Sequence, residues 1–322
     1  MQNPVCLPTA IFLMGPTASG KSQIALDIAK NFPIEIISVD SAQVYRYMDI
    51  GTAKPGQEIL AHVPHHLINL IDPDQSYSAA RFRQDALGVM QDISSRNKIP
   101  LLVGGTMLYF RALQEGLSVL PVADQDLRLK LENMAEKHGW PAMHQKLYQL
   151  DPAIATRIKP NDSQRIQRAL EVCYLTRQPM SEILKSFQPT DFPYRKISIA
   201  LMPSERSQLH LRIAERFRSM LNAGLIEEVQ SIRQKFPALS AESPSMRCVG
   251  YRQICLYLDN KIDSNELQDM GIAATRQLAK RQLTWLRSMR VTDKIYELDC
   301  LSSDLSTQVN NLIRTAIGIR TG

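Results

Sequence analysis

The 322-residue sequence predicts an α/β fold: a parallel sheet flanked by helices, with an all-helical domain inserted into it. Three observations support this prediction. Short apolar runs alternate with helical patterns over the first hundred residues, as in parallel sheets covered on both faces. From about residue 121 to 192 helical patterns follow one another without a strand, after which another apolar run returns the chain to the sheet. A glycine-rich motif stands between the first apolar run and the first helix.

The elements of the core are expected in a fixed order. Strands are predicted for the apolar runs Ala10 to Met14, Ile34 to Val39, Ile99 to Val103 and Ile197 to Met202. Helices are predicted by their periodicity at Lys21 to Asn31, Gln208 to Ala223, Leu225 to Lys235, Arg252 to Asn260 and Asn265 to Arg290. Parallel sheets bind ligands beyond the carboxyl ends of their strands, so Gly15, Asp40 and Gly104 mark the expected binding edge.

The inserted segment is predicted to form a helical domain. Its helices are expected at Asp124 to His138, Pro141 to Gln149, Asp162 to Leu175 and Ser181 to Ser186, with prolines between them. The expected domains are therefore a core of residues 1–119 and 193–322 and an insertion of residues 120–192.

The composition is that of an ordinary globular protein, with 44% hydrophobic and 22% charged residues. A net charge of +6 is compatible with a polyanionic partner but does not establish one. No run is long enough to cross a bilayer and no signal peptide is evident, so we expect a cytoplasmic protein without membrane association. Nothing suggests an obligate protein partner, and a monomer is expected. The cysteines show neither disulfide nor zinc spacing; they are Cys6, Cys173, Cys248, Cys255 and Cys300.

The glycine-rich motif matches the phosphate-loop pattern G-x-x-x-x-G-K-[ST] at every position; it reads Gly15-Pro16-Thr17-Ala18-Ser19-Gly20-Lys21-Ser22. In such a loop backbone N–H groups and the helix N-terminus hold phosphate oxygens, the lysine adds a mobile charge, and Ser22 can ligate Mg²⁺. These features predict a P-loop NTPase-like core that binds a diphosphate or a triphosphate. They do not name the reaction, because the same loop can serve a kinase or hold a diphosphate that leaves.

A carboxylate and two histidines follow the second predicted strand. Asp40 stands directly after that strand, so we expect it to face the ligand crevice next to the phosphate loop. It could hold Mg²⁺ through water, accept a proton from a hydroxyl or an amine, or only cap the loop. The adjacent His65 and His66 are interpreted as packing or hydrogen-bonding residues, because neighbours in a strand point apart and no third metal ligand is evident.

Six segments in one order resemble the tRNA dimethylallyltransferase family, also called isopentenyltransferases. They are the phosphate loop, Asp40 to Tyr45, Gly51 to Pro55, His65 to Leu67, Gly104 to Tyr109 and Arg247 to Gln253. The likeness extends from about residue 10 to 290 and is far more specific than a P-loop alone. It implies Mg²⁺, a dimethylallyl diphosphate donor, and an acceptor adenosine immediately 3′ of the anticodon, at tRNA position 37. Transfer to N6 of that adenosine gives N6-(dimethylallyl)adenosine and releases diphosphate.

The resemblance also implies roles for individual residues. Thr17 to Ser22 would bind the donor's diphosphate, Asp40 would be the general base, and Arg216 would act on the leaving diphosphate. Thr106 would lie beside the reacting amine. Contacts to the tRNA anticodon stem-loop are implied for Thr106, Arg128 and three stretches: Asp40-Ser41-Ala42-Gln43, Gln164-Arg165-Ile166-Gln167-Arg168 and Arg247-Cys248-Val249-Gly250-Tyr251-Arg252.

Two departures from the family's pattern bear on this expectation. Ser22 stands where many members have threonine, but both side chains carry the hydroxyl that Mg²⁺ requires. No cluster of cysteine and histidine follows Arg290, so the zinc finger of eukaryotic relatives is absent and a bacterial-type enzyme is expected. Basic residues at helical spacing, Arg276, Lys280 and Arg287, suit a tRNA backbone better than a small acceptor.

Three other functions are compatible with parts of the sequence. A small-molecule or nucleoside kinase would use the loop for ATP and the helical insertion as a lid. An adenylate prenyltransferase would share the transfer chemistry but act on free nucleotides. A non-catalytic RNA-binding protein could retain the fold, although intact Lys21, Ser22 and Asp40 argue against that.

Overall fold

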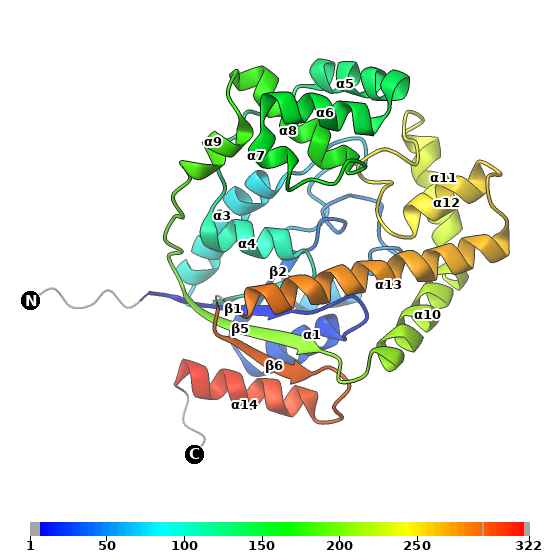
Figure 1. Cartoon of the computed structure of the whole chain (residues 1–322). Helices are drawn as coiled ribbons and strands as arrows, with labels where there is room; N and C mark the ends of the chain where they lie inside the picture. Colours follow the sequence, from blue (N-terminus) through cyan, green and yellow to red (C-terminus); the bar gives the residue numbers. More distant parts are fainter. Residues whose placement is uncertain (1–6, 292, 319–322) are drawn as a thin grey trace, which may run out of the picture. The chain divides into compact units, whose positions relative to one another are not determined.

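The computed structural model describes residues 7–291 and 293–318 of the chain (Figure 1). The chain divides into two compact units. One consists of Met1–Gln114 and Phe192–Gly322, and the other of Glu115–Asp191.

A parallel sheet forms the centre of the first unit. In the described residues it has six strands in the order β3-β2-β4-β1-β5-β6, and every pairing is parallel. The strands are β1 (Thr9–Met14), β2 (Ile34–Val39), β3 (His65–His66), β4 (Ile99–Gly104), β5 (Arg195–Met202) and β6 (Ile295–Asp299). Because β4 lies between β1 and β2, the loops that follow these three strands meet at one edge of the sheet. The predicted α/β fold with a P-loop NTPase-like core is confirmed.

Helices cover both faces of the sheet (Figure 1). On one face α1 (Lys21–Asn31) and α14 (Leu305–Ile317) pack against Ile11 and Leu13 of β1. On the other face α3 (Ala79–Ser95), α4 (Met107–Glu115) and the end of α13 (Ser264–Met289) pack against Phe12 and Met14. Successive side chains of a strand point to opposite faces, so a continuously apolar β1 supplies both layers of the core.

A third packing layer lies beyond the carboxyl edge of the sheet. The loop after β2, which includes α2 (Gln57–His62), packs through Val44 and Met48 against α11 (Leu225–Lys235) and α12 (Tyr251–Leu258). The helix α10 (Arg206–Asn222) packs along α13 through Leu209, Ile213 and Phe217. This layer brings residues from the second half of the sequence to the phosphate loop.

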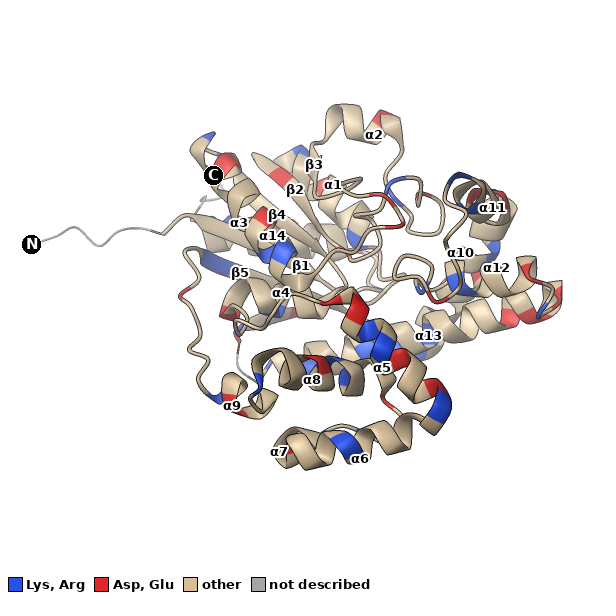
Figure 2. Ribbon diagram, turned by 90° about the horizontal axis from the view of Figure 1, so that it is seen from above, with Lys and Arg blue, Asp and Glu red and all other residues tan. Residues whose placement is uncertain are grey.

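The second unit is all-helical. Its helices are α5 (Gln125–His138), α6 (Trp140–Leu150), α7 (Pro152–Ala155), α8 (Ser163–Thr176) and α9 (Met180–Lys185). They share a core that includes Leu131, Leu147, Ile166 and Leu170. Both basic and acidic residues lie along α5 (Figure 2).

The predicted strands and helices are confirmed to within two residues at either end. The elements that were not predicted are α2, β3, α3, α4, α7, β6 and α14. The two adjacent histidines form the edge strand β3, and His66 Nε2 lies 2.7 Å from the carboxylate of Glu35, so the expected hydrogen-bonding role is confirmed. None of the helices in the described ranges is long and apolar enough to cross a membrane. Cys173, Cys248, Cys255 and Cys300 are free thiols, whereas Cys6 lies outside the described residues.

Candidate active site

The phosphate loop turns tightly between β1 and α1. A Cβ atom on Gly15 would lie 2.8 Å from Ser19 Oγ and 3.1 Å from the carbonyl of Leu201, so no side chain fits there. Gly20 adopts a φ of 82° at the start of α1, a left-handed conformation that favours glycine. The two glycines thus allow the loop to close over a space that the N-terminus of α1 faces.

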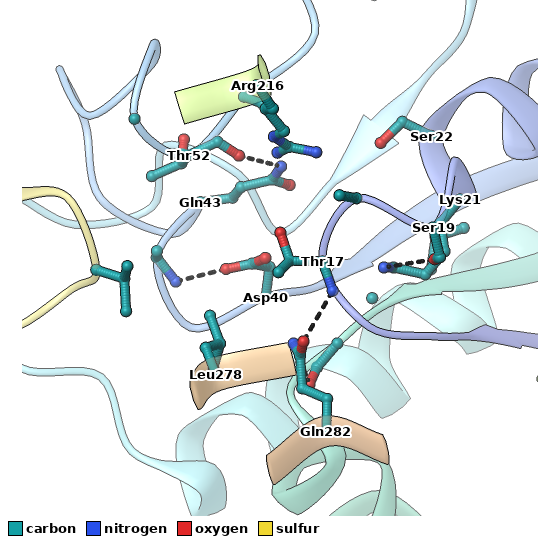
Figure 3. A pocket seen from close by; sticks show the side chains of 18 of the residues that line it. Thr17, Ser19, Lys21, Ser22, Asp40, Gln43, Thr52, Arg216, Leu278 and Gln282 are labelled. Atoms are coloured by element: carbon teal, nitrogen blue, oxygen red, sulfur yellow. Dashed lines mark hydrogen bonds between the residues drawn. The ribbon is translucent and has the colours of Figure 1, made fainter. Parts of the chain in front are cut away.

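Two cations line that space, and neither forms an ion pair with any of the described residues. Lys21 Nζ donates to the carbonyl of Pro16 at 2.6 Å, and burial, followed by the positive charge of Arg216, lowers the pKa of Lys21 to about 7. Arg216 forms no hydrogen bond or ion pair with any of the described residues. Its side chain points into the space beside the phosphate loop (Figure 3). Burial lowers the pKa of Arg216, and Asp40 opposes the shift. Two desolvated cations side by side favour an anionic ligand.

The pocket enclosed by these residues has a volume of about 230 Å³. Pockets for drug-sized ligands are typically about 300–1,000 Å³, so this one suits a smaller molecule. An apolar recess adjoins it, and the two share Thr17, Ala18 and Arg216. The recess is lined by Ile213, Phe217, Met220, Leu225 and Leu278. The arrangement pairs a phosphate-binding loop with space for a short hydrocarbon chain.

Asp40 lies where this pocket meets a second, wider cavity. It follows β2, and its Oδ1 accepts a hydrogen bond from the N–H of Ala42 at 2.8 Å (Figure 3). It lines both the pocket and a cavity of about 520 Å³. That cavity is also lined by Thr106, Leu108, Arg247, Arg281 and Trp285. A nucleophile in the wider cavity could attack a ligand in the phosphate-loop pocket. A carboxylate at the junction can accept the proton that this nucleophile loses.

Thr106 is tied to the loop that carries Asp40. Its Oγ1 accepts a hydrogen bond from the N–H of Ser41 at 3.1 Å, and its own N–H donates to the carbonyl of Val39 at 3.2 Å. Gln43 braces the same loop, because it accepts from Ser38 Oγ at 2.7 Å and donates to the carbonyl of Thr52 at 3.2 Å (Figure 3). The structure therefore brings Asp40, Thr106 and the phosphate loop together. This was expected, because each follows a strand of the same parallel sheet.

A family model described as IPP transferase matches residues 43–289, and one described as Isopentenyl transferase matches residues 8–69. The tRNA dimethylallyltransferase of Nitrosomonas eutropha is 61% identical over 307 residues, which is 95% of this chain and 96% of that protein. That of Nitrosospira multiformis is 62% identical over 306 residues, 95% of this chain and 94% of the relative. The chain belongs to the tRNA dimethylallyltransferase family. The resemblance noted in the sequence is confirmed.

Solved structures of the dimethylallyltransferase family agree with this fold. The full-length tRNA isopentenylpyrophosphate transferase of Bacillus halodurans has a TM-score of 0.68 and 35% identity, over 96% of this chain and 97% of that one. A eukaryotic dimethylallyltransferase, described as acting on tRNA, has a TM-score of 0.78 and 29% identity, over 97% of this chain and 78% of the other.

The residues expected to contact tRNA in a dimethylallyltransferase fall into both units. In the helical unit Arg128 and Arg168 both bind the buried carboxylate of Glu171, and Arg128 Nε lies 2.8 Å from it. Burial alone would raise the pKa of Glu171, but hydrogen bonds from the two arginines lower it. Both guanidinium groups are therefore held in fixed orientations, on side chains that are partly exposed.

The stretch Gln164 to Arg168 does not present every side chain to solvent. Gln164 and Arg165 are exposed, and Arg165 lies 3.3 Å from Asp162. Gln167 donates to Glu132 at 2.9 Å. Ile166 is fully buried in the core of the helical unit, so its side chain stabilises that core and only the backbone of this residue is left for the predicted tRNA contact. Its apolar character follows from helical periodicity.

The stretch Arg247 to Arg252 also combines exposed and buried side chains. Arg247 and Arg252 are exposed and lie 3.6 Å and 2.8 Å from Glu242. Cys248 and Val249 line the cavities beside Asp40, and burial raises the pKa of the Cys248 thiol to about 12. Tyr251 is fully buried, so its side chain is unavailable to a tRNA. Gly250 precedes it with a φ of 92° at the start of α12.

Tyr251 instead belongs to a group that the sequence analysis missed. Glu228 of α11 accepts hydrogen bonds from the N–H groups of Asp49 at 3.0 Å and Ile50 at 2.7 Å, and from Tyr251 Oη at 2.6 Å. Burial, then Glu228, raises the pKa of Tyr251. A Cβ atom on Gly51 would lie 2.5 Å from the Tyr251 ring. Glu228 and Tyr251 thus fix the loop that forms one wall of the pocket. In the sequence, Gly51 is the one local sign of this close packing.

Gln282 of α13 is a second missed residue. Its Oε1 accepts a hydrogen bond from the N–H of Thr17 at 2.8 Å, and its Nε2 donates to the carbonyl of Gly105 at 3.0 Å (Figure 3). These partners lie 265 and 177 residues away in the sequence. A contact between a side chain and such distant backbone leaves no local signal.

Proposed function

We propose that the chain transfers the dimethylallyl group of dimethylallyl diphosphate to N6 of the adenosine at tRNA position 37, next to the anticodon, in the cytoplasm. The product is N6-(dimethylallyl)adenosine, and diphosphate is released. The observation that carries the proposal is the position of Asp40, at the junction of a phosphate-binding pocket and a wider cavity. Family membership supplies the donor and the class of acceptor.

The donor occupies the pocket of the phosphate loop. Its diphosphate lies against the loop N–H groups, Lys21 and Arg216, and its five-carbon chain extends into the apolar recess beside Phe217 and Leu278. Negative charge grows on the diphosphate as the allylic C–O bond breaks. Preorganised donors and cations that face this charge lower the barrier, and a single such donor is typically worth about 3–4 kcal/mol.

Mg²⁺ fits the donor set at this site. The described residues contain no group of three or more His, Cys, Asp or Glu side chains that could hold a metal alone. Ser22 carries an exposed hydroxyl on the wall of the pocket, and Mg²⁺ commonly binds through one or two protein oxygens together with phosphate oxygens. When bound, the ion would neutralise charge on the diphosphate.

Asp40 removes the proton from the attacking amine. The N6 lone pair forms the new bond to the allylic carbon, the C–O bond breaks, and its electron pair leaves with the diphosphate. The N6 proton passes to the Asp40 carboxylate, which the Ala42 N–H orients. Thr106 holds the loop of Asp40 from the acceptor side. A general base of this kind typically contributes about 10²–10⁴-fold in rate.

The acceptor enters through the wider cavity. An adenine in a stacked loop cannot reach Asp40, so the nucleotide has to flip out, which costs a few kcal/mol and less in a single-stranded loop. Trp285 and Arg281 line the cavity and offer a ring and a guanidinium plane for stacking. Arg247 and Arg252 in the core, and Arg128, Arg165 and Arg168 in the helical unit, contact the anticodon stem-loop.

Two other reactions remain as outcomes of the test. A P-loop kinase would consume ATP, and an adenylate prenyltransferase would modify AMP or ATP. The acceptor cavity of about 520 Å³ is more than twice the size of the donor pocket, which favours a large acceptor.

The proposal is tested by supplying labelled dimethylallyl diphosphate and Mg²⁺ with bulk tRNA, AMP or ATP as acceptor. We expect label in tRNA only, and its loss in Asp40→Ala. Asp74→Ala is the matched control, because Asp74 is exposed and has no hydrogen-bonding role in the described structure. Label in AMP or ATP, or ATP turnover without label transfer, would replace the proposed function with one of the alternatives.

A further inference from the structure

Gln282 connects the two halves of the reaction site through one side chain. Its oxygen holds the N–H of Thr17 in the donor loop at 2.8 Å, and its nitrogen holds the carbonyl of Gly105 at 3.0 Å. Gly105 immediately precedes Thr106, which holds the loop of Asp40. Gln282 lines both the donor pocket and the wider cavity. A single amide thus fixes the donor side and the acceptor side relative to each other.

The Gln282 side chain is closely packed between the two segments that it contacts. A Cβ atom on Gly105 would lie 2.2 Å from Gln282 Nε2 and 3.3 Å from the carbonyl of Gly15, so Gly105 is packed closely against both the amide and the phosphate loop. The neighbours Ala279, Leu283 and Leu286 are almost fully buried and anchor α13. The amide therefore projects from a rigid helix rather than from a mobile loop.

We infer that Gln282 is a positioning residue that sets the distance between the donor's allylic carbon and the acceptor's amine. This inference rests on the proposed function. The Thr17 N–H is already bonded to Gln282, so it fixes the loop and leaves the diphosphate to the other groups of the pocket. Because α13 also carries Arg281 and Trp285 into the wider cavity, an acceptor that contacts this helix acts on the donor loop through the same amide.

A positioning role differs in its kinetics from a purely structural one. The two hydrogen bonds lie at the reacting centre, and a misplacement of about 1 Å there can cost about 10²-fold in rate. Donor binding depends on Lys21, Arg216 and the remaining loop N–H groups, which Gln282 does not contact in the described structure. Loss of the amide should therefore lower kcat and leave the KM for the donor nearly unchanged.

The test is Gln282→Met, which keeps the length of the side chain but removes both hydrogen bonds. Its matched control is Gln277→Met, since Gln277 lies on the same helix, is exposed and has no hydrogen-bonding role in the described structure. We expect Gln282→Met to lower kcat by about tenfold to a hundredfold with a donor KM within about threefold of the wild type. Gln277→Met should match the wild type.

Hydrogen–deuterium exchange tests the same inference without using activity. In Gln282→Met, exchange should rise both in the peptide with the phosphate loop and in the peptide with residues 104–107, and in neither for Gln277→Met. Faster exchange with an unchanged kcat would overturn the positioning role, as would a kcat loss shared by the control. A wild-type enzyme that transfers no label would instead refute the proposed function, and the exchange result would still show whether the amide couples the two segments.

Discussion

The lowered pKa of Lys21 predicts how donor binding depends on pH. Burial and the positive charge of Arg216 bring this pKa from 10.5 to about 7, so the free enzyme loses the proton near neutral pH. A bound diphosphate has the opposite effect, because a nearby negative charge favours the protonated amine. Above pH 7 the donor should therefore bind together with a proton.

The magnitude follows from the two pKa values. If the bound amine returns to 10.5, it stays protonated in the complex up to pH 9. In the free enzyme its protonated fraction falls from about one half at pH 7 to about one hundredth at pH 9. The affinity should then fall by about fiftyfold between pH 7 and pH 9, and by only about twofold between pH 6 and pH 7. The donor's own charge changes little in the upper range, because a phosphate group has its second pKa near 6.

Isothermal titration of dimethylallyl diphosphate, without tRNA, measures this effect. Titrations in two buffers with different ionisation enthalpies count the protons taken up, and about one is expected at pH 9. Lys21→Arg is the control, since a guanidinium stays charged throughout and should flatten the profile. An affinity that is constant from pH 7 to pH 9, with no proton uptake in the wild type, would refute the role assigned to burial.

Three further predictions follow from named contacts. Asp40→Asn keeps the acceptor for the Ala42 N–H but removes the base, so transfer should slow by about 10²–10⁴-fold at unchanged donor affinity. Glu35→Gln breaks the buried ion pairs of a carboxylate whose pKa is lowered to about 2 by Arg96 and Lys98 against the effect of burial. It should cost about 3 kcal/mol of unfolding free energy at pH 7, by chemical denaturation. Arg247→Gln should reduce the slope of log affinity for tRNA against log salt by about 0.7.

Each of these predictions has its own contrary result. A wild-type rate in Asp40→Asn would exclude this carboxylate as the base. The wild type should lose stability as the pH falls from about 4.5 toward 2, because the folded state favours the ionised Glu35 carboxylate. The Glu35→Gln variant should not show this loss of stability. An equal cost for Glu58→Gln, which is exposed, would contradict this. An unchanged salt slope for Arg247→Gln, or the same decrease for Arg314→Gln on α14, would remove Arg247 from the tRNA interface.

Local sequence signals predicted much of the core. The bounds of α1 and α11, predicted from periodicity, agree with the structure, in which Gly20 and Gly224 precede them in left-handed conformations. The strand β6 was missed because it is an edge strand in which Tyr296 and Glu297 are partly exposed, so it lacks a continuous apolar run. In α14 the spacing of Leu305, Val309 and Ile313 did carry a helical signal that was not used.

In the candidate site, too, some residues could be predicted from local motifs and others could not. The phosphate loop and Asp40 could be predicted, because their chemistry depends on short motifs at strand ends. Glu228 and Gln282 could not, since each acts on backbone that only the fold brings near. The side chains of Ile166 and Tyr251 are buried although both residues lie in stretches predicted to contact tRNA, because a helix exposes only part of its surface.

The central claim is that Asp40 deprotonates N6 of the adenosine next to the anticodon. Its most direct test is mass spectrometry of nucleosides and oligonucleotides from tRNA that has reacted with dimethylallyl diphosphate, for the wild type and Asp40→Asn. We predict N6-(dimethylallyl)adenosine at position 37 alone, and its loss in the variant while donor binding persists. An adduct at another nucleoside, or undiminished modification by Asp40→Asn, would contradict the account.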